Sequence, residues 1–577
     1  MTLKPKRMDS TSGFIPRDNI KSLLGLKGRF GDICADVVMA LASIHRINRI
    51  FRPLDSLKGF EFAGGAIREL DVRPVINEDE LSLIPEIGPF IICSNHPFGC
   101  IDGLIMISAI GKIRPDVRFM TNFILSQIPC LQELFIPVDP FSKGAVRSVK
   151  GVRSALEHLK AGHPLVIFPA GEVSSNRNPE HVVKDIEWDR GSARLIERAG
   201  VPVIPAYFDG SNSKYFHFLG GIHPFLRTLR LPAEMLNKRG REIILKFGKA
   251  VSPSEFKRFG APEQLASYLR NRTYALEGTR TGTGYAVPEK NSSAIAPHID
   301  PAILHAELEC LESGILYKEG GYTCYVNRYE EIPNIIQEIG VCREETFRQN
   351  GEGTGNSTDL DEYDKYYLHL HLWHDGTREL VGAYRVGVGT EIMKSKGIRG
   401  FYTDSFFHYK DEFGPILEQS LELGRSFIVP KFQIVPNALK MLLHKGIGTL
   451  SLRYPAARYL FGAASISSEM PKLFSSIMVE YFKRAMYDRD LGGLTASDNP
   501  FVPEFCRMDI DALNLETLTP DQFDRLLSRL SGGRYRMPAL MRAYAKSNCK
   551  FIGFNIDHNF GDCTDALLLV DLRNIGN

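Results

Sequence analysis

The sequence predicts an α/β protein with two domains. The chain has 577 residues of ordinary globular composition, enough for two or more separate cores. Each half alternates short apolar runs with amphipathic stretches, a pattern typical of strands and helices that share a sheet. A run of Gly, Thr, Pro and Ser at 278–300 interrupts the alternation and is typical of a linker. We therefore expect a helical segment over 1–55, an α/β domain over 56–277 and a second over 301–577.

Composition and charge exclude several classes of protein. The net charge of +2 argues against a nucleic-acid binder, which usually carries a large basic excess. None of the 10 cysteines has C-x-x-C spacing, so we expect reduced cytosolic thiols, no metal site and no tightly bound cofactor. We also expect neither a secretory signal nor a membrane span, because no apolar stretch reaches the ~18 residues that a span needs.

Residues 18–50 have a helical pattern that ends in basic residues. Three cations, at His45, Arg46 and Arg49, alternate there with apolar side chains. Such a segment could lie on an anionic membrane surface. A packed N-terminal helix is an equal alternative.

Each expected domain contains four strands with clear apolar runs. In the first, amphipathic helices are expected at 146–161 and 191–199. The strands are expected at 90–94, 165–168, 201–208 and 243–247, then at 366–373, 379–388, 426–429 and 460–466 in the second domain.

A histidine and an aspartate follow the apolar strand that ends at Ser94. The segment reads S-N-H-P-F-G-C-I-D-G-L, with His96 in the turn and Asp102 at the start of an apolar helix. The carboxyl end of a strand is where open α/β sheets place their sites. A carboxylate beside an imidazole fixes its tautomer, so that His96 could take a proton from an alcohol that attacks an acyl group. A structural histidine is the alternative.

Three later segments strengthen the catalytic interpretation. They read F-I-P-V-D from Phe135, F-P-A-G-E-V-S from Phe168 and V-P-V-I-P from Val201. With the histidine segment they resemble, over about 60–260, the four blocks of the glycerolipid acyltransferases. The resemblance implies that His96 and Asp102 are catalytic and that Gly171 and Glu172 bind the acceptor.

The chain departs from that family at three points. Five residues rather than four separate His96 from Asp102, and Gly99 could absorb the extra one. Asp139 stands where the second block has an arginine, and the arginine of the third block is missing. Because arginine is the bidentate partner of phosphate, these losses point toward the subgroup that acylates lyso-aminolipids. Substitute cations, or merely solvated charges, are Lys184, Arg190 and Arg194.

A second ordered set of charged residues occupies the C-terminal half, and its members are Arg343, Asp361, Asp364, Arg385, Glu422 and Arg425. It resembles the acyl-homoserine-lactone synthases, and more closely the ornithine-lipid N-acyltransferases often labelled "hemolysin", over about 300–490. The resemblance implies a GNAT-like fold, with Glu422 as the base for an ammonium group. A buried ion pair between Glu422 and Arg425, within a structural salt-bridge network, is the alternative. The residues implied to contact the acceptor are Arg343, Asp361, Asp364, Arg385 and Arg425.

The acyl donor is expected to be acyl carrier protein, with acyl-coenzyme A left open for the N-terminal site. No glycine-rich loop that could hold a pyrophosphate follows the strand ending at Val429. The following helix, expected over 436–445, and its surroundings carry Lys431, Lys440 and Lys445, which suit an acidic carrier protein. A solvated charge run is the alternative.

Together the two resemblances imply a bifunctional aminolipid synthase, like the fused ornithine-lipid synthases. The C-terminal domain would N-acylate an amino acid with a 3-hydroxy fatty acyl group, and the N-terminal domain would O-acylate the lyso-aminolipid. Such an enzyme would lie peripherally on the cytoplasmic face of the inner membrane. The amino acid stays open among ornithine, glycine, glutamine and lysine. Alternatives are a phospholipid acyltransferase with a carrier-docking C-terminal domain, and a membrane-active hemolysin.

Overall fold

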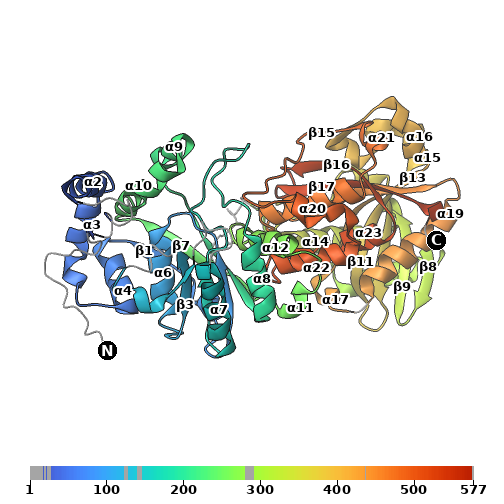
Figure 1. Ribbon diagram of the computed structural model, residues 1–577. Coiled ribbons are helices and arrows are strands. Elements are labelled where there is room, and N and C mark those ends of the chain that lie inside the picture. The colour runs from blue at the N-terminus through green and yellow to red at the C-terminus, as the bar shows by residue number, and fades with distance from the viewer. Residues whose placement is uncertain are drawn as a thin grey trace. The chain divides into compact units, whose positions relative to one another are not determined.

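The chain folds into two compact units (Figure 1). The computed structural model describes residues 17–18, 21, 28–122, 128–138, 146–279, 292–435 and 437–574. The first unit runs to Thr281 and also contains Cys506–Leu513, and the second contains the rest. Most of the expected linker, 280–291, lies outside the described residues, so the domain bounds remain a prediction.

A seven-stranded sheet forms the first unit, in the order β1-β7-β6-β2-β5-β3-β4. Its central strand β2 has all four residues buried and is parallel to both neighbours, β5 and β6. The carboxyl ends of these three strands therefore meet at one edge. The strands are β1 Arg73–Val75, β2 Ile91–Ser94, β3 Arg118–Asn122, β4 Phe135–Val138, β5 Leu165–Ile167, β6 Val203–Phe208 and β7 Glu242–Phe247.

Helices surround this sheet at the expected places. Within the described residues, the N-terminal segment is helical as expected, and it breaks between α2 and α3, where Ser43 takes a left-handed conformation with φ of 59°. Helix α10 packs against α2, α3, α6 and α9. The main helices are α2 Gly28–Leu41, α3 Ile44–Phe51, α4 Gly59–Glu69, α6 Cys100–Ile110, α7 Val146–Lys160, α8 Arg190–Ala199, α9 Lys214–Ile222, α10 Pro224–Leu236 and α12 Pro262–Tyr274.

An eight-stranded sheet forms the second unit, in the order β16-β17-β14-β13-β11-β10-β9-β8. Strands β13 and β14 are parallel, whereas the other recorded neighbours are antiparallel. The strands are β8 Ile315–Glu319, β9 Tyr322–Arg328, β10 Leu368–His374, β11 Glu379–Val388, β13 Ser420–Ile428, β14 Tyr459–Ile466, β16 Lys550–Asp557 and β17 Cys563–Asp571.

One local expectation for this unit is wrong, and a second is confirmed only in part. Strand β13 begins at Ser420 rather than at 426, so Glu422 lies inside a strand and not before it. The helix expected over 436–445 is α18 Ala438–Lys440 followed by a π-helix at Met441–Ile447, and Pro436 lies outside the described residues. Other helices here are α14 Ile335–Gln349, α15 Gly389–Lys396, α16 Gly414–Glu418, α17 Pro430–Gln433, α19 Gly448–Arg453 and α20 Lys472–Ala485.

Gly389 lets α15 approach the start of β13 closely. A Cβ on Gly389 would lie 2.0 Å from the Leu417 carbonyl oxygen and 2.7 Å from that of Ser420. Gly389→Ala should therefore destabilise the second unit by about 1–3 kcal/mol, as overpacking typically does. Urea unfolding measures the change. The matched control is Gly448→Ala, where a Cβ meets nothing within 4 Å; it should be neutral or stabilising. Equal stability of the two variants would contradict the close approach.

Candidate active sites

His96 and Asp102 meet in the first unit in spite of their five-residue separation. His96 lies in the turn after the central strand β2, and Asp102 is in the first turn of α6. His96 Nδ1 is 3.0 Å from Asp102 Oδ2, an ion-pair distance, although the angle is not that of a hydrogen bond. The Asp102 carboxylate is fully buried, and the His96 side chain is 19% exposed. This arrangement holds Nδ1 toward the carboxylate and leaves Nε2 for a substrate hydroxyl.

Gly99 accommodates the extra residue between them. Its φ is 87°, a left-handed value that glycine adopts without strain. The turn directs the backbone N–H groups of Phe98 and Gly99 onto Asp102 Oδ2, at 2.9 and 3.0 Å. Asp102 thus stabilises the first turn of α6 and faces His96 with the same oxygen.

Asp185 secures the backbone of His96 from the other side. Its carboxylate accepts hydrogen bonds from the Ser174 hydroxyl, the Trp188 indole and, at 3.3 Å, the His96 backbone N–H. Burial raises the pKa of Asp185. The sequence motifs do not include Asp185, because it lies in an irregular segment far along the chain.

Glu172 pairs with an arginine that is not part of the sequence motifs. Arg227 of α10 donates to Glu172 Oε2 at 2.9 Å, and Arg177 lies 3.3 Å from the other oxygen. Two of the three cations considered as substitutes pair elsewhere: Lys184 with Glu180, and Arg190 with Glu263.

Arg227 belongs to a buried cationic group beside the His96 turn. Lys238 is 5% exposed, lies over the Phe98 ring and donates to the Ser211 carbonyl. Burial lowers the pKa of both Arg227 and Lys238. Buried cations beside the turn suit an anionic group on the acceptor. Gly171 lies in the turn before Glu172, with φ of 68° and no atom within 4 Å of where a Cβ would be.

A buried charge network occupies the second site. Asp364 accepts from Arg343 at 3.0 Å and from Arg385 at 3.3 Å, and Arg385 also bonds to Asp361. Arg343 lies 3.2 Å from Asp359 as well. Burial acts to raise the pKa of Asp364, but Arg343 and Arg385 hold it well below the usual value. The network joins α14, the turn at Glu362–Lys365 and β11.

Glu422 is not paired with Arg425, so the proposed ion pair between them is wrong. Its two oxygens accept from the Tyr367 hydroxyl, the Tyr402 N–H at 3.0 Å, and the N–H and hydroxyl of Thr403 at 2.8 and 2.6 Å. These four donors fill the acceptor positions of a carboxylate. Glu422 therefore braces the turn at Tyr402–Ser405 against β13.

Arg425 lies at a bulge in β13 and faces a different set of carboxylates. Its φ is 51°, and it is 3.4 Å from Asp359 and 3.9 Å from Asp361. Its guanidinium stacks on the rings of Tyr402 and Phe560. The predicted residues Arg343, Asp361, Asp364, Arg385 and Arg425 are thus brought together, whereas Glu422 lies beside them without an ion pair.

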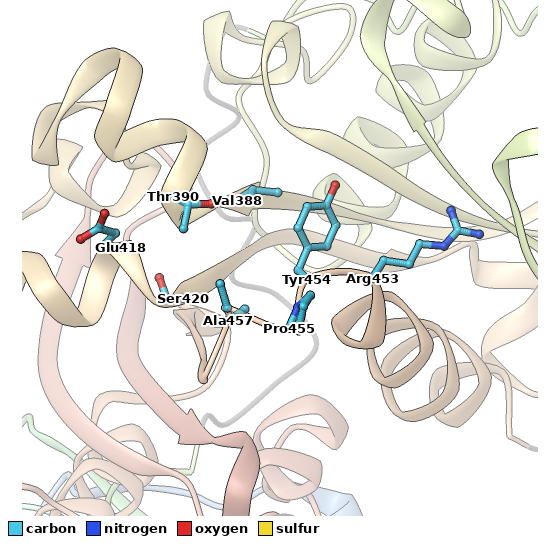
Figure 2. A pocket seen from close by; sticks show the side chains of 9 residues that line it. Val388, Thr390, Glu418, Ser420, Arg453, Tyr454, Pro455 and Ala457 are labelled. Atoms are coloured by element: carbon cyan, nitrogen blue, oxygen red, sulfur yellow. The ribbon is translucent and has the colours of Figure 1, made fainter.

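The three predicted carrier-binding lysines differ in their surroundings. Lys431 pairs with Glu379 and Lys445 with Glu319, while Lys440 is exposed. A small pocket of about 150 Å³ lies elsewhere, at the start of β13. Figure 2 shows Tyr454 on one side of this pocket and Glu418 on the other. None of the predicted site residues lines it.

Two comparisons of the sequence with known families agree with this division. Residues 36–282 match the family described as "Acyltransferase", and residues 342–443 match "Acetyltransferase (GNAT) domain". Within the described residues, no helix is long and apolar enough to cross a membrane.

The chain is also similar to two separate enzymes of Bacteroides thetaiotaomicron. A glycine N(alpha)-acyltransferase is 28% identical over 263 residues, 44% of this chain and 77% of the relative. A lyso-glycine lipid O-acyltransferase is 27% identical over 225 residues, 38% of this chain and 80% of the relative. The crystal structure of the Thermotoga maritima 1-acyl-sn-glycerophosphate acyltransferase aligns with 39% of this chain and 80% of its own, at 20% identity and a TM-score of 0.26. The chain is therefore an enzyme that transfers acyl groups, with an acyltransferase domain in its N-terminal half and a GNAT domain in its C-terminal half.

Proposed function

We propose that the chain makes a diacylated aminolipid in two steps. The GNAT domain first transfers a 3-hydroxy fatty acyl group to the amine of an amino acid. The acyltransferase domain then transfers a second acyl group to the 3-hydroxyl. The two relatives named for glycine and lyso-glycine lipid make glycine the leading acceptor.

The observation that carries this proposal is the His96–Asp102 pair within a chain that holds two acyl-transfer domains. A hydroxyl is almost wholly protonated near neutral pH and needs a base before it can attack an acyl group. With Nδ1 held toward Asp102, His96 Nε2 can take that proton. The buried cations Arg227 and Lys238 beside the turn suit the carboxylate of a lyso-aminolipid.

His96→Ala should separate the two steps. Loss of a general base costs about 10²–10⁴-fold, so the diacylated lipid should vanish while the monoacylated form accumulates. Mass spectrometry of lipid extracts from expressing cells measures both. His163→Ala, which removes a half-exposed histidine of the same unit, is the control.

Glu422→Ala should abolish both lipids, because the precursor is not made. Added synthetic lyso-lipid should then restore the diacylated product. Wild-type levels of that product in His96→Ala would rule out His96 as the base. An altered phospholipid profile with no aminolipid would instead favour a phospholipid acyltransferase.

An exposed apolar surface of the first unit supports attachment to a membrane. Helices α2 and α9 each carry three exposed apolar side chains at spacings that share one helix face. Both helices pack against α10, and Figure 1 shows the three together at one end of the unit. Arg46 and Arg49 on the adjacent α3 are exposed and would face anionic headgroups. The apolar surface consists of Phe30, Ile33, Val37, Tyr215, Phe218 and Ile222.

Phe218→Asp combined with Ile222→Asp should reduce binding to anionic lipid vesicles. Both side chains are more than 60% exposed, so the substitutions should leave folding intact. Cosedimentation with vesicles measures binding. Ile87→Asp, at an 86% exposed position away from these helices, is the matched control. Equal binding by the two variants, or resistance of the wild-type protein to carbonate extraction, would contradict peripheral attachment through this surface.

The helices that follow β13 support acyl carrier protein as the donor for the GNAT domain. Lys440 is exposed there, and the side chain of Ile434 is 88% exposed. An acidic carrier protein would meet a cation and an apolar contact on this surface.

Lys440→Glu should raise KM for the acylated carrier several-fold at low salt, with little change in kcat. The difference should shrink as salt screens the charges. Steady-state kinetics measures both constants. Lys550→Glu, on β16 at the far edge of the sheet, is the control. Equal turnover of acyl-coenzyme A by the wild-type enzyme would contradict the choice of donor.

A further inference from the structure

Strands β13 and β14 separate after a short parallel pairing. They pair from Ser420–Tyr459 as far as Leu423–Gly462. Beyond that point β13 continues against β11, and β14 continues against β17 to Ile466. Arg425 lies on β13 just after the separation, at the bulge.

Polar residues share one face of the strands beyond this separation. Ser465 of β14 and Asn555 of β16 are both cross-strand partners of Asp565 on β17. Asp557 pairs with Cys563, two residues further along each strand. Direct partners and residues two apart project to the same face of a sheet. Asn555, Asp557 and Asp565 are all buried.

Glu352 joins this face from the loop after α14. It is half-buried and hydrogen-bonds to Ser465. The β16–β17 hairpin packs closely against the loop that contains Glu352, since a Cβ on Gly561 would lie 2.4 Å from the Gly351 carbonyl oxygen. We call Glu352, Arg425, Asn555, Asp557 and Asp565 the acidic chamber.

The chamber holds more negative charge than its own cation can balance. Arg425 is the cation that acts on Glu352 and Asp565, and it already lies against Asp359 and Asp361. Asp565 accepts from the Cys563 thiol at 3.7 Å, a weak interaction. Buried carboxylates that lack enough cationic partners tend to take up protons or to bind an added cation.

Two donors in the chamber lack hydrogen-bond acceptors among the described residues. Asn555 is fully buried; its Oδ1 accepts from the Asn499 N–H at 2.8 Å, and its Nδ2 has no partner. Arg425 Nε lies within ion-pair distance of Asp359 but makes no hydrogen bond. Unpartnered buried donors are costly, so they indicate a ligand with acceptor oxygens.

We propose that the acidic chamber binds the zwitterion of the amino acid acceptor and that Glu352 is the base for its ammonium group. The side-chain carboxylates of the chamber bind the ammonium group of the amino acid. Asn555 Nδ2 and Arg425 bind its carboxylate. This inference rests on the proposed N-acylation. It assigns the base to Glu352 because Glu422 has four donors on its two oxygens and is left with a positioning role.

The reaction balances with these groups. Glu352 takes one proton from the ammonium, and the nitrogen lone pair attacks the thioester carbonyl carbon. The C–N bond forms as the C–S bond breaks, and the second proton leaves nitrogen for the departing thiolate. The products are the amide, the free carrier thiol and the proton that Glu352 releases to solvent.

Burial places the pKa of Glu352 in the right range for this step. Burial raises its pKa to about 7, with Arg425 and the Ser465 bond acting to lower it. Burial and neighbouring carboxylates raise the pKa of Asp565 well above its usual value. The other titratable groups that face the chamber are Asp557, Cys563, Tyr402 and the exposed Glu469.

The test uses the full chain with a 3-hydroxyacyl thioester of acyl carrier protein and glycine. The wild-type rate should rise with pH through about 7 as Glu352 deprotonates. Glu352→Gln keeps the size of the side chain and should lower kcat by about 10²–10⁴-fold. It should also remove the rise of the rate with pH. Glu412→Gln, at an exposed position of the second unit outside the chamber, is the control and should keep kcat. An unchanged kcat and pH profile in folded Glu352→Gln would overturn the proposal.

A second variant tests the chamber if Glu352→Gln does not fold. Asn555→Asp keeps the bond from Asn499 and removes the Nδ2 donor. It should raise the KM for glycine by about 10–100-fold. The KM for methylamine, which lacks the carboxylate, should not change. Equal effects on both amines would overturn the binding role. If the wild-type enzyme acylates neither glycine nor any other amino acid, the proposed function itself fails.

Discussion

The site of the second unit depends on the ion pairs that Asp364 makes with two arginines. It is fully buried and receives two arginines, Arg343 from α14 and Arg385 from β11. A buried charge is tolerated only when it is paired, and removal of one partner typically costs about 3–5 kcal/mol. The pairing therefore fixes a helix and a strand to the turn that carries Asp364. That turn in turn presents Asp361 to Arg385 and to Arg425 at the β13 bulge.

The first unit also contains a buried carboxylate, and there the backbone supplies most of the stabilising contacts. Asp102 is fully buried, and its charge is met by two N–H groups of the preceding turn and by His96. The same contacts stabilise the start of α6 and orient the imidazole. Gly99 is what permits the five-residue spacing, since its left-handed conformation lets the backbone fold back onto the carboxylate.

Two acyl-transfer domains in one chain suit a product made in sequence. The 3-hydroxyl that the acyltransferase domain would acylate is introduced with the acyl chain that the GNAT domain attaches. The chemistry of the two sites differs accordingly. An alcohol needs a base such as His96 during attack, whereas an ammonium must lose a proton before its lone pair exists.

The sequence by itself determined about half of the strands of the two sheets, and it singled out residues that the structure brings together in each unit. Apolar runs and periodicity depend on neighbours in the chain, so β2, β11 and β14 could be predicted closely, as could the meeting of His96 with Asp102 across one short turn. It did not determine where β13 begins, because Ser420 and Glu422 interrupt the apolar pattern. Ser420 donates to the nearby Leu417 carbonyl, whereas the buried Glu422 accepts from Thr403, 19 residues away.

Only the tertiary structure decided which charges meet across long stretches of chain. Arg227 reaches Glu172 from 55 residues away, and Glu352 joins strands that lie more than a hundred residues later. No local pattern encodes such pairings. They follow from sheet order and strand register, which place Asn555, Asp565 and Ser465 on one face, and from the way α10 packs against α6.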